Sequence, residues 1–215
     1  MAYRRTERVE EQLQEKRERI LQAVRQVVGE VGFRGAQVAI VAEAAGVATG
    51  SVYRYFPSKG ELFAEALALN AQHEVNVVAA VAEAEGSATS RLRDALRVFA
   101  ERAVRARRLA WAMIAEPTEP EVEEARLTYR RAFAEVFEQL IRHGMRNREF
   151  PPQNAAASAA CVMGALSEGL IGPLAPEAPD LSDTRALIAA ITTFCLQAVS
   201  ASPGAPSLRV VEHKR

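Results

Sequence analysis

Residues 44–60 gather side chains that could bind nucleic acid. The segment contains Arg54 and Lys59 and no acidic residue, and it also carries the hydroxyl of Thr49 and the phenol of Tyr53. Cationic, hydroxyl and phenol groups donate hydrogen bonds to base edges and phosphate oxygens. By charge alone the segment would equally fit a chance gap between acids, so the interpretation depends on how it folds.

The hydrophobic spacing around this segment predicts two short helices joined by a sharp turn. Apolar residues repeat at i, i+3, i+4 and i+7 in the first helix, at Val38, Val41, Ala42 and Ala45. Gly46 ends this helix, and Val47 fills the angle before the next one. The second helix is expected from about Thr49 to Phe56, where Pro57 ends it. Two short helices with a glycine in the turn between them are the parts of a helix-turn-helix.

The helix-turn-helix motif spans residues 37–56. Its second helix presents two different faces. Val52 and Phe56 lie four positions apart and face the core. A different face is polar, aromatic and basic, with Thr49, Gly50, Tyr53 and Arg54. Its glycine permits close approach to DNA. The pattern predicts a recognition helix whose N-terminal residues read base edges in the major groove.

The remaining periodicity predicts an all-α protein with about nine helices. Alanine is abundant, β-branched runs are short, and no hairpin signal separates alternating segments. A helix from about Leu13 precedes the motif and stops at Gly32. After the motif, Ser58 and Glu61 form a capping box at the start of a fourth helix, which continues to about residue 85. The later helices are expected at about 91–108, 119–148, 153–172 and 183–201, with a short piece around Trp111 and a second capping box from Thr118 and Glu121.

These elements divide the chain into segments with different roles. We expect a flexible basic arm at 1–12, a helix-turn-helix domain at 13–62, a larger helical domain at 63–202 and a disordered tail at 203–215. The formal charge is zero, but residues 1–62 carry ten Lys and Arg against eight Asp and Glu. This distribution suits a protein that meets DNA with one end only.

Over about residues 32–62 the sequence resembles the tetracycline-repressor (TetR) family. The residues that carry the resemblance are Gly32-Phe33, Val38, Val41-Ala42, Ala45-Gly46-Val47, Gly50, Val52-Tyr53, Tyr55-Phe56, Ser58-Lys59 and Glu61-Leu62. Beyond this stretch only the number of helices and the chain length agree. The resemblance implies a three-helix DNA-binding domain, a ligand-binding and dimerisation domain at 63–202, and a homodimer on palindromic double-stranded operator DNA. Repression is the usual mode of the family.

The resemblance also assigns roles to single residues. It implies that Gly50 and Tyr53 contact bases or the sugar-phosphate backbone. It places Tyr55 and Lys59 on phosphates and Gln37 near another phosphate. Together with the recognition face, the candidate DNA-binding residues are Gln37, Thr49, Gly50, Ser51, Tyr53, Arg54, Tyr55 and Lys59.

Aromatic and sulfur side chains of the larger domain either pack in its core or line a ligand cavity. They are Phe99, Trp111, Met113, Tyr129, Phe133, Phe137 and Met163. A helical domain of this size can hold an apolar pocket with a few polar groups, and the resemblance implies one lined mostly by the fourth to eighth helices. The apolar lining predicts a hydrophobic or amphipathic small-molecule effector. Seven arginines at residues 91–108 are interpreted as a solvated helix face, the alternative being a second nucleic-acid site.

The last two helices are apolar on more than one face and must be covered by something. Two such helices from each subunit would form a four-helix bundle across a twofold axis. The alternative is burial within the monomer. The expected interface residues are Ala160, Gly164, Ala165, Leu187, Ile191 and Phe194.

The sequence lacks the motifs of common enzyme classes. Its three histidines have no metal-ligand partner at i+3 or i+4, and it contains no HExxH, CxxC, phosphate-binding glycine loop or Gly-x-Ser-x-Gly. We expect no enzyme activity, no metal and no cofactor. An architectural DNA-binding protein without a ligand, and then a helical enzyme, are the alternatives to a ligand-responsive regulator.

Compartment and cysteine state follow from composition. Residues 1–20 are charged and residues 155–174 are interrupted by Glu168 and Pro173, so we expect neither a signal peptide nor a membrane span. Cys161 and Cys195 lie in apolar helical patterns and are expected to be buried thiols, not a disulfide. These features predict a cytoplasmic protein with no membrane partner.

Overall fold

The structure, a computed structural model, describes residues 7–179 and 183–201. In these residues it contains nine helices and no strand, which confirms the all-α prediction. The helices are α1 (Glu7–Gly35), α2 (Val38–Ala44), α3 (Thr49–Val52), α4 (Lys59–Ala82), α5 (Ala88–Arg105), α6 (Arg107–Ile114), α7 (Pro120–Arg146), α8 (Ala155–Leu174) and α9 (Thr184–Ser200). The tail at 203–215 lies outside the described residues.

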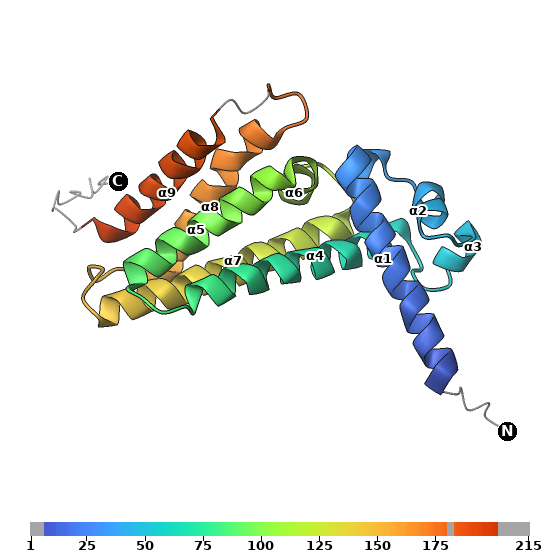
Figure 1. Cartoon of the computed structure of the whole chain (residues 1–215), viewed down its shortest axis with the longest axis horizontal. Coiled ribbons are helices and arrows are strands. Elements are labelled where there is room, and N and C mark those ends of the chain that lie inside the picture. Colours follow the sequence, from blue (N-terminus) through green and yellow to red (C-terminus); the bar gives the residue numbers. More distant parts are fainter. Residues whose placement is uncertain (1–6, 180–182, 202–215) are drawn as a thin grey trace, which may run out of the picture.

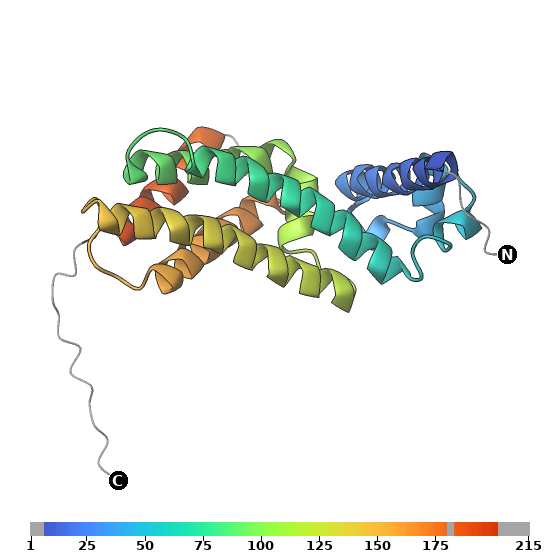
Figure 2. The ribbon, with the colours of Figure 1, turned by 90° about the horizontal axis from the view of Figure 1, so that it is seen from below.

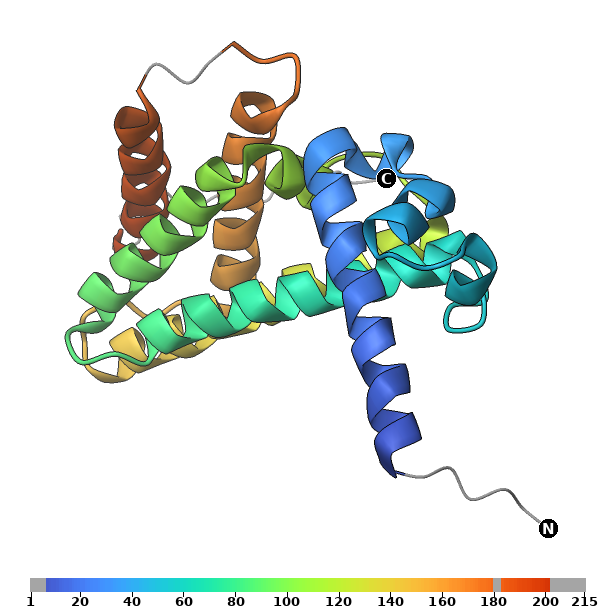
Figure 3. The ribbon, with the colours of Figure 1, turned by 45° about the vertical axis from the view of Figure 1, so that its right-hand side comes forward.

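The helices form an elongated molecule with the helix-turn-helix at one end. In Figure 1, α2 and α3 lie at the right, and α8 and α9 lie at the upper left. The long helices α4 and α7 connect the two ends and lie side by side, as Figure 2 also shows. Helix α1 crosses α4 near the helix-turn-helix (Figure 3).

Helix α1 differs from its prediction at both ends. It begins at Glu7, so residues 7–12 are helical and do not form the predicted arm, while residues 1–6 lie outside the described part. It also does not stop at Gly32, which instead makes a kink with φ 74° and ψ 176° before the helix resumes to Gly35. A positive φ costs glycine little, so the chain bends at this point and continues.

One predicted capping contact forms and another does not. Ser58 Oγ accepts a hydrogen bond from the Glu61 backbone N–H at 3.1 Å, and this bond begins α4. The predicted box of Thr118 and Glu121 is wrong, because Glu119 is the residue before α7 and no side chain caps that end. Pro120 already occupies the first helical position, where its ring favours the helical φ.

Two hydrophobic cores stabilise the molecule. The N-terminal core contains buried residues of α1 to α4, among them Val24, Phe33, Val41 and Phe63, and also Ala112 of α6 and Val122 of α7. The predicted boundary at residue 62 therefore lies within α4, whose residues as far as Ala71 belong to this core.

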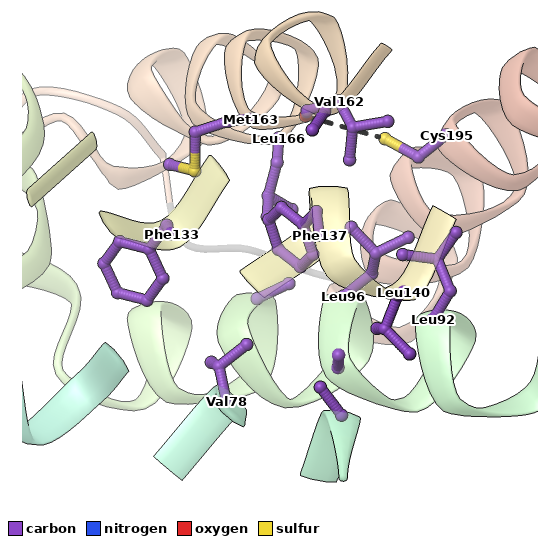
Figure 4. Close-up of a cluster of buried hydrophobic side chains, with 14 of the residues drawn as sticks. Val78, Leu92, Leu96, Phe133, Phe137, Leu140, Val162, Met163, Leu166 and Cys195 are labelled. Carbon is purple, nitrogen blue, oxygen red and sulfur yellow. Dashed lines mark hydrogen bonds between the residues drawn. The ribbon is translucent and has the colours of Figure 1, made fainter. Parts of the chain in front are cut away.

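The C-terminal core surrounds Phe137, which is fully buried. Figure 4 shows Phe137 from α7 between Leu96 of α5 and Leu166 of α8. Cys195 of α9 is buried in the same core, and burial raises the pKa of its thiol to about 11. The prediction of two buried thiols is wrong for Cys161, which is exposed because it lies on the outer side of α8.

Helix α8 is long and apolar enough to cross a membrane by length and composition. Its residues Leu166, Leu170 and Leu174 are fully buried in the C-terminal core. Its exposed side carries alanines, Cys161 and Glu168. A core helix of a soluble protein passes the same test of length and composition, so α8 is no indication of a membrane protein.

Candidate DNA-binding surface and ligand cavity

The turn between α2 and α3 has the geometry expected of a helix-turn-helix. Gly46 has φ 67°, a conformation that residues with a Cβ rarely adopt. The next backbone N–H, that of Val47, donates to the Ala42 carbonyl at 2.9 Å. Val52 and Phe56 are buried in the N-terminal core, and α3 packs against α2. Helix α3 is shorter than predicted, since it ends at Val52 and continues as turns to Tyr55.

The predicted DNA-contact residues lie together at this end of the molecule. Five of them are exposed, namely Gln37, Thr49, Gly50, Tyr53 and Arg54, and three are half-buried, namely Ser51, Tyr55 and Lys59. Tyr53 is 49% exposed although it neighbours the buried Val52. A Cβ added to Gly50 would meet no atom within 4 Å, so packing within the chain does not require a glycine there.

Lys59 is engaged by an acidic partner that the sequence analysis did not identify. Its Nζ lies 2.8 Å from Glu119 Oε1 and 5.1 Å from the centroid of the Phe63 ring. Burial acts to raise the pKa of Glu119, but hydrogen bonds from Lys59 and Thr118 outweigh it, and the pKa lies below its ordinary value. A phosphate that binds Lys59 must therefore compete with a carboxylate.

An apolar cavity lies between α4 and the helices of the larger domain. Its volume is about 110 Å³. Five of the predicted pocket residues line it, namely Phe99, Met113, Tyr129, Phe133 and Met163. The Phe99 and Phe133 rings meet edge to face, with centroids 5.0 Å apart. The cavity is thus bounded by side chains from six helices, α4 to α8 and, through Arg25, α1.

Two predicted pocket residues do not line this cavity. Phe137 is fully buried in the C-terminal core because it points from α7 toward α5 and α8. Trp111 is half-buried and packs against the same core. Apolar residues at helical spacing look alike in sequence whether they fill a core or border a cavity, which explains the difference.

The cavity wall also contains polar side chains that the sequence analysis missed. Arg102 forms a two-pronged hydrogen bond with Glu74, at 2.5 and 2.8 Å. Arg126 is 8% exposed and donates to the carbonyls of Ala112 and Met113 at the end of α6, at 3.0 and 2.8 Å. These contacts satisfy orphan carbonyls of the last helical turn and join α6 to α7.

Another missed residue, Glu116, connects the cavity wall to the DNA-binding end. Its carboxylate is 3% exposed and accepts hydrogen bonds from the backbone N–H groups of Phe33, at 2.7 Å, and Arg34, at 3.2 Å. These N–H groups follow the kink at Gly32. The Glu116 carbonyl in turn accepts from Arg126 at 2.8 Å. A lone glutamate before Pro117 gives no sequence signal for such a contact.

The predicted dimer residues differ in their exposure. Ala160 is exposed, and Gly164, Ala165 and Leu187 are half-buried. Phe194 is 61% exposed, a large value for an aromatic side chain. Ile191 is buried within the chain, where it packs on Gly169 of α8, so its side chain belongs to the monomer core.

No group of three or more His, Cys, Asp or Glu side chains that could hold a metal ion occurs in the described residues.

Two models of the tetR family match the sequence and together cover more than half of it. The model of bacterial regulatory proteins of the tetR family matches residues 20–66. The model of a tetracyclin repressor-like C-terminal domain matches residues 85–168. The HTH-type transcriptional repressor KstR of Rhodococcus jostii is 48% identical over 54 residues, which are 25% of this chain and 26% of KstR. The chain thus aligns with only about a quarter of that repressor.

Solved structures of regulators share the whole fold. FadR from Bacillus subtilis in complex with stearoyl-CoA superposes with a TM-score of 0.70 at 17% identity, over 85% of this chain and 97% of FadR. A TetR-family regulator from Agrobacterium tumefaciens gives 0.71 at 17% identity, over 88% and 100%. At 17% sequence identity, the likeness to these two structures shows a shared fold and nothing beyond it. The helix-turn-helix geometry and the two family matches together show that the chain belongs to the tetR family of bacterial regulatory proteins and is a transcriptional regulator.

Proposed function

We propose that this regulator is a cytoplasmic repressor that binds a palindromic operator as a homodimer and is released by a hydrophobic or amphipathic small molecule. The observation that carries the proposal is the course of α4. Its first residue, Lys59, lies beside the recognition face, while Leu67, Asn70 and Ala71 of the same helix line the cavity. One helix therefore borders both sites.

The DNA-binding half of the proposal is supported by the surface around α3. Thr49 and Gly50 of α3 and Tyr53, which directly follows it, are exposed, and buried Val52 anchors this segment in the N-terminal core. Such a helix reads base edges when it enters the major groove. Repression is supported by the KstR relative, which is a transcriptional repressor and aligns over about a quarter of its length.

The effector half is supported by the apolar cavity. The FadR neighbour of the same fold was solved with stearoyl-CoA, an amphiphile. The cavity of about 110 Å³ is smaller than typical ligand pockets of roughly 300–1,000 Å³. We therefore expect an effector of ordinary size to widen the cavity, and a shift of α4 and α6, which line it, relative to α7 would do so.

Movement of α4 offers a route from the cavity to DNA. If α4 swings as the cavity widens, the separation of the two recognition helices in a dimer changes. A ligand shifts such an equilibrium only by its difference in affinity for the two states. A hundredfold release requires about 2.7 kcal/mol of differential affinity.

Reciprocal binding measurements test the proposal. Genomic footprinting of the full chain would identify an operator duplex, and stearoyl-CoA would serve as the first probe. Trp111 lies on α6, so its fluorescence should report the movement of this helix. We expect the operator to weaken probe binding by the same factor by which the probe weakens operator binding. Equal probe affinities with and without operator would show that the cavity is not the switch.

A further inference from the structure

A second hollow lies between α1 and the junction of α5 and α6, and it adjoins the cavity. Its volume is about 740 Å³. Its polar lining consists of Gln22, Arg25, Gln26, Arg105, Arg107 and Arg108. We call it the arginine groove. None of the described residues that line the groove is acidic.

The arginines of the α5–α6 region fall into two classes. Arg97 and Arg102 form ion pairs with carboxylates, and Arg107 donates to the carbonyls of Ala175 and Ala178 near the end of α8. Arg105 and Arg108, by contrast, are exposed and have no carboxylate partner in the described part of the chain. Cationic side chains that line one hollow without acids attract anions into it.

Arg25 connects the groove to the cavity. It lines both hollows, as do Ala106 and Leu109. Its Nε donates to Asn70 Oδ1 of α4 at 2.7 Å, and Asn70 also lines the cavity. A basic groove, with no acidic residue in its described lining, therefore adjoins a predominantly apolar cavity at a shared wall.

We infer that the arginine groove binds the phosphate-bearing head group of an amphipathic effector whose apolar chain occupies the cavity. The inference rests on the proposed function, because it assumes that the cavity takes an effector. Guanidinium groups bind phosphate oxygens through paired, charge-assisted hydrogen bonds. One such bond contributes about tenfold in affinity.

The double variant Arg105→Gln/Arg108→Gln tests the groove without changing the cavity lining. Arg93→Gln is the matched control, since Arg93 is an exposed arginine about three turns earlier on α5. Isothermal titration calorimetry of the full chain would compare three probes with the same chain, namely dodecanoyl-coenzyme A, dodecyl phosphate and dodecanoic acid. Coenzyme A alone would be the fourth probe.

For the wild-type protein we expect a phosphate-bearing probe to bind at least about tenfold more tightly than dodecanoic acid. The double variant should lose this preference, while its affinity for dodecanoic acid changes less than about twofold. Arg93→Gln should behave as wild type. Coenzyme A without a chain should bind at least about tenfold more weakly than its dodecanoyl thioester, because it leaves the cavity empty. A preference for the thioester over dodecyl phosphate would assign the head group to a nucleotide, and the reverse would assign it to a lipid phosphate.

Four results would overturn the inference, and they separate it from the proposed function. If the double variant keeps the preference for phosphate, the groove is not the head-group site. If wild type binds all three chain-bearing probes alike, the head-group site is refuted and the effector cavity stands. If wild type binds none of them, the inference and the effector half of the proposed function fail together. A loss of DNA affinity in the double variant with unchanged probe binding would assign the groove to DNA and also refute the inference.

Discussion

At the scale of single residues, α3 separates core contacts from surface contacts within one helical turn. Val52 is 1% exposed, and its neighbour Tyr53 is 49% exposed. The phenol of Tyr53 therefore contributes little to packing, and its expected role is in DNA binding. Gly50 lies on the exposed side, where a side chain would meet no atom of the chain.

Replacement of Tyr53 should weaken DNA binding without unfolding the protein. We expect Tyr53→Ala to lower affinity for the footprinted operator by about tenfold or more, because one base or backbone contact contributes about 1–3 kcal/mol. Thermal unfolding should stay within a few degrees of wild type. Leu127→Ala is the matched control, since Leu127 is 54% exposed on α7. Unchanged operator affinity in Tyr53→Ala would remove this residue from the contact surface.

Lys59 and Glu119 provide a second test at the residue scale. Because the pKa of Glu119 is lowered in the fold, the ion pair contributes stability above the ordinary glutamate pKa and loses it as pH falls through the folded-state value. The pair is therefore intact at neutral pH and competes with phosphate. Glu119→Gln should raise affinity for DNA severalfold at low salt, and Lys59→Ala should lower the salt slope by about one unit.

The control for Glu119→Gln is Glu124→Gln, which removes the same charge from an exposed position near the start of α7. The DNA affinities of Glu119→Gln and Glu124→Gln would be measured over a salt series with the same operator duplex. Equal gains in the two variants would attribute the effect to net charge. An unchanged slope in Lys59→Ala would show that this lysine makes no phosphate contact.

At the scale of helices, the end of α6 joins the larger domain to the DNA-binding end. Arg126 donates hydrogen bonds to the Ala112 carbonyl in the last turn of α6 and to the Glu116 carbonyl after it. The Glu116 carboxylate accepts a hydrogen bond from the Phe33 N–H, which follows the kink in α1. A Cβ at Gly32 would lie 2.7 Å from the Glu116 carboxylate oxygens, so the kink and the carboxylate fit each other closely. Any movement of α6 therefore acts on α1 directly, in addition to the route through α4.

Changes at this contact should reduce the stability of the fold. We expect Glu116→Gln to lower the free energy of unfolding by about 1–3 kcal/mol, because the buried N–H of Phe33 and the partly buried N–H of Arg34 lose a charged acceptor. Gly32→Ala should cost about 1–3 kcal/mol from the backbone conformation alone, φ 74° and ψ 176°, which essentially only glycine adopts. Its contact with the carboxylate adds to this cost. Urea unfolding with Glu124→Gln as control measures the first effect. Wild-type stability in both variants would show that the contact is dispensable.

At the scale of the whole molecule, α8 and α9 lie at the end opposite the helix-turn-helix (Figure 3), and small and apolar residues are exposed on them. Ala160 and Cys161 of α8 are exposed, and Phe194 of α9 is 61% exposed. Two copies of this surface would bury these residues across a twofold axis. The surface supports the proposed homodimer through α8 and α9.

An arginine on this surface should separate the subunits. We expect Ala160→Arg and Phe194→Arg to sediment as monomers at micromolar concentration, because an unpaired charge in a packed interface costs several kcal/mol. Operator affinity should also fall in both variants, because separate subunits no longer bind the two half-sites of the operator together. Leu127→Arg is the control on α7. Ile191 is not suited to this test, because its side chain is buried within the monomer. A wild-type protein that sediments as a monomer would contradict the proposal.

The sequence by itself determined the helices and the helix-turn-helix. Their signals involve residues within about four positions, such as the apolar spacing of Val38, Val41 and Ala42, or the Ser58 hydroxyl on the Glu61 N–H. The exposed face of α3 was predictable for the same reason, because helical periodicity assigns each residue to a side. Family resemblance rested on the same local stretch.

Only the tertiary structure decided which distant side chains meet. Glu116 binds the N–H of Phe33, 83 positions away, and Arg25 of α1 lines one groove with Arg105 and Arg108. No local pattern encodes such partners, because they depend on how α1, α6 and α7 pack against one another. The same reason separates Ile191, buried on Gly169, from the exposed Phe194 on the same helix. Hydrophobic periodicity shows that a helix face is apolar and must be buried. Only the packing of the helices shows whether that face is buried within the same chain or is left for another molecule.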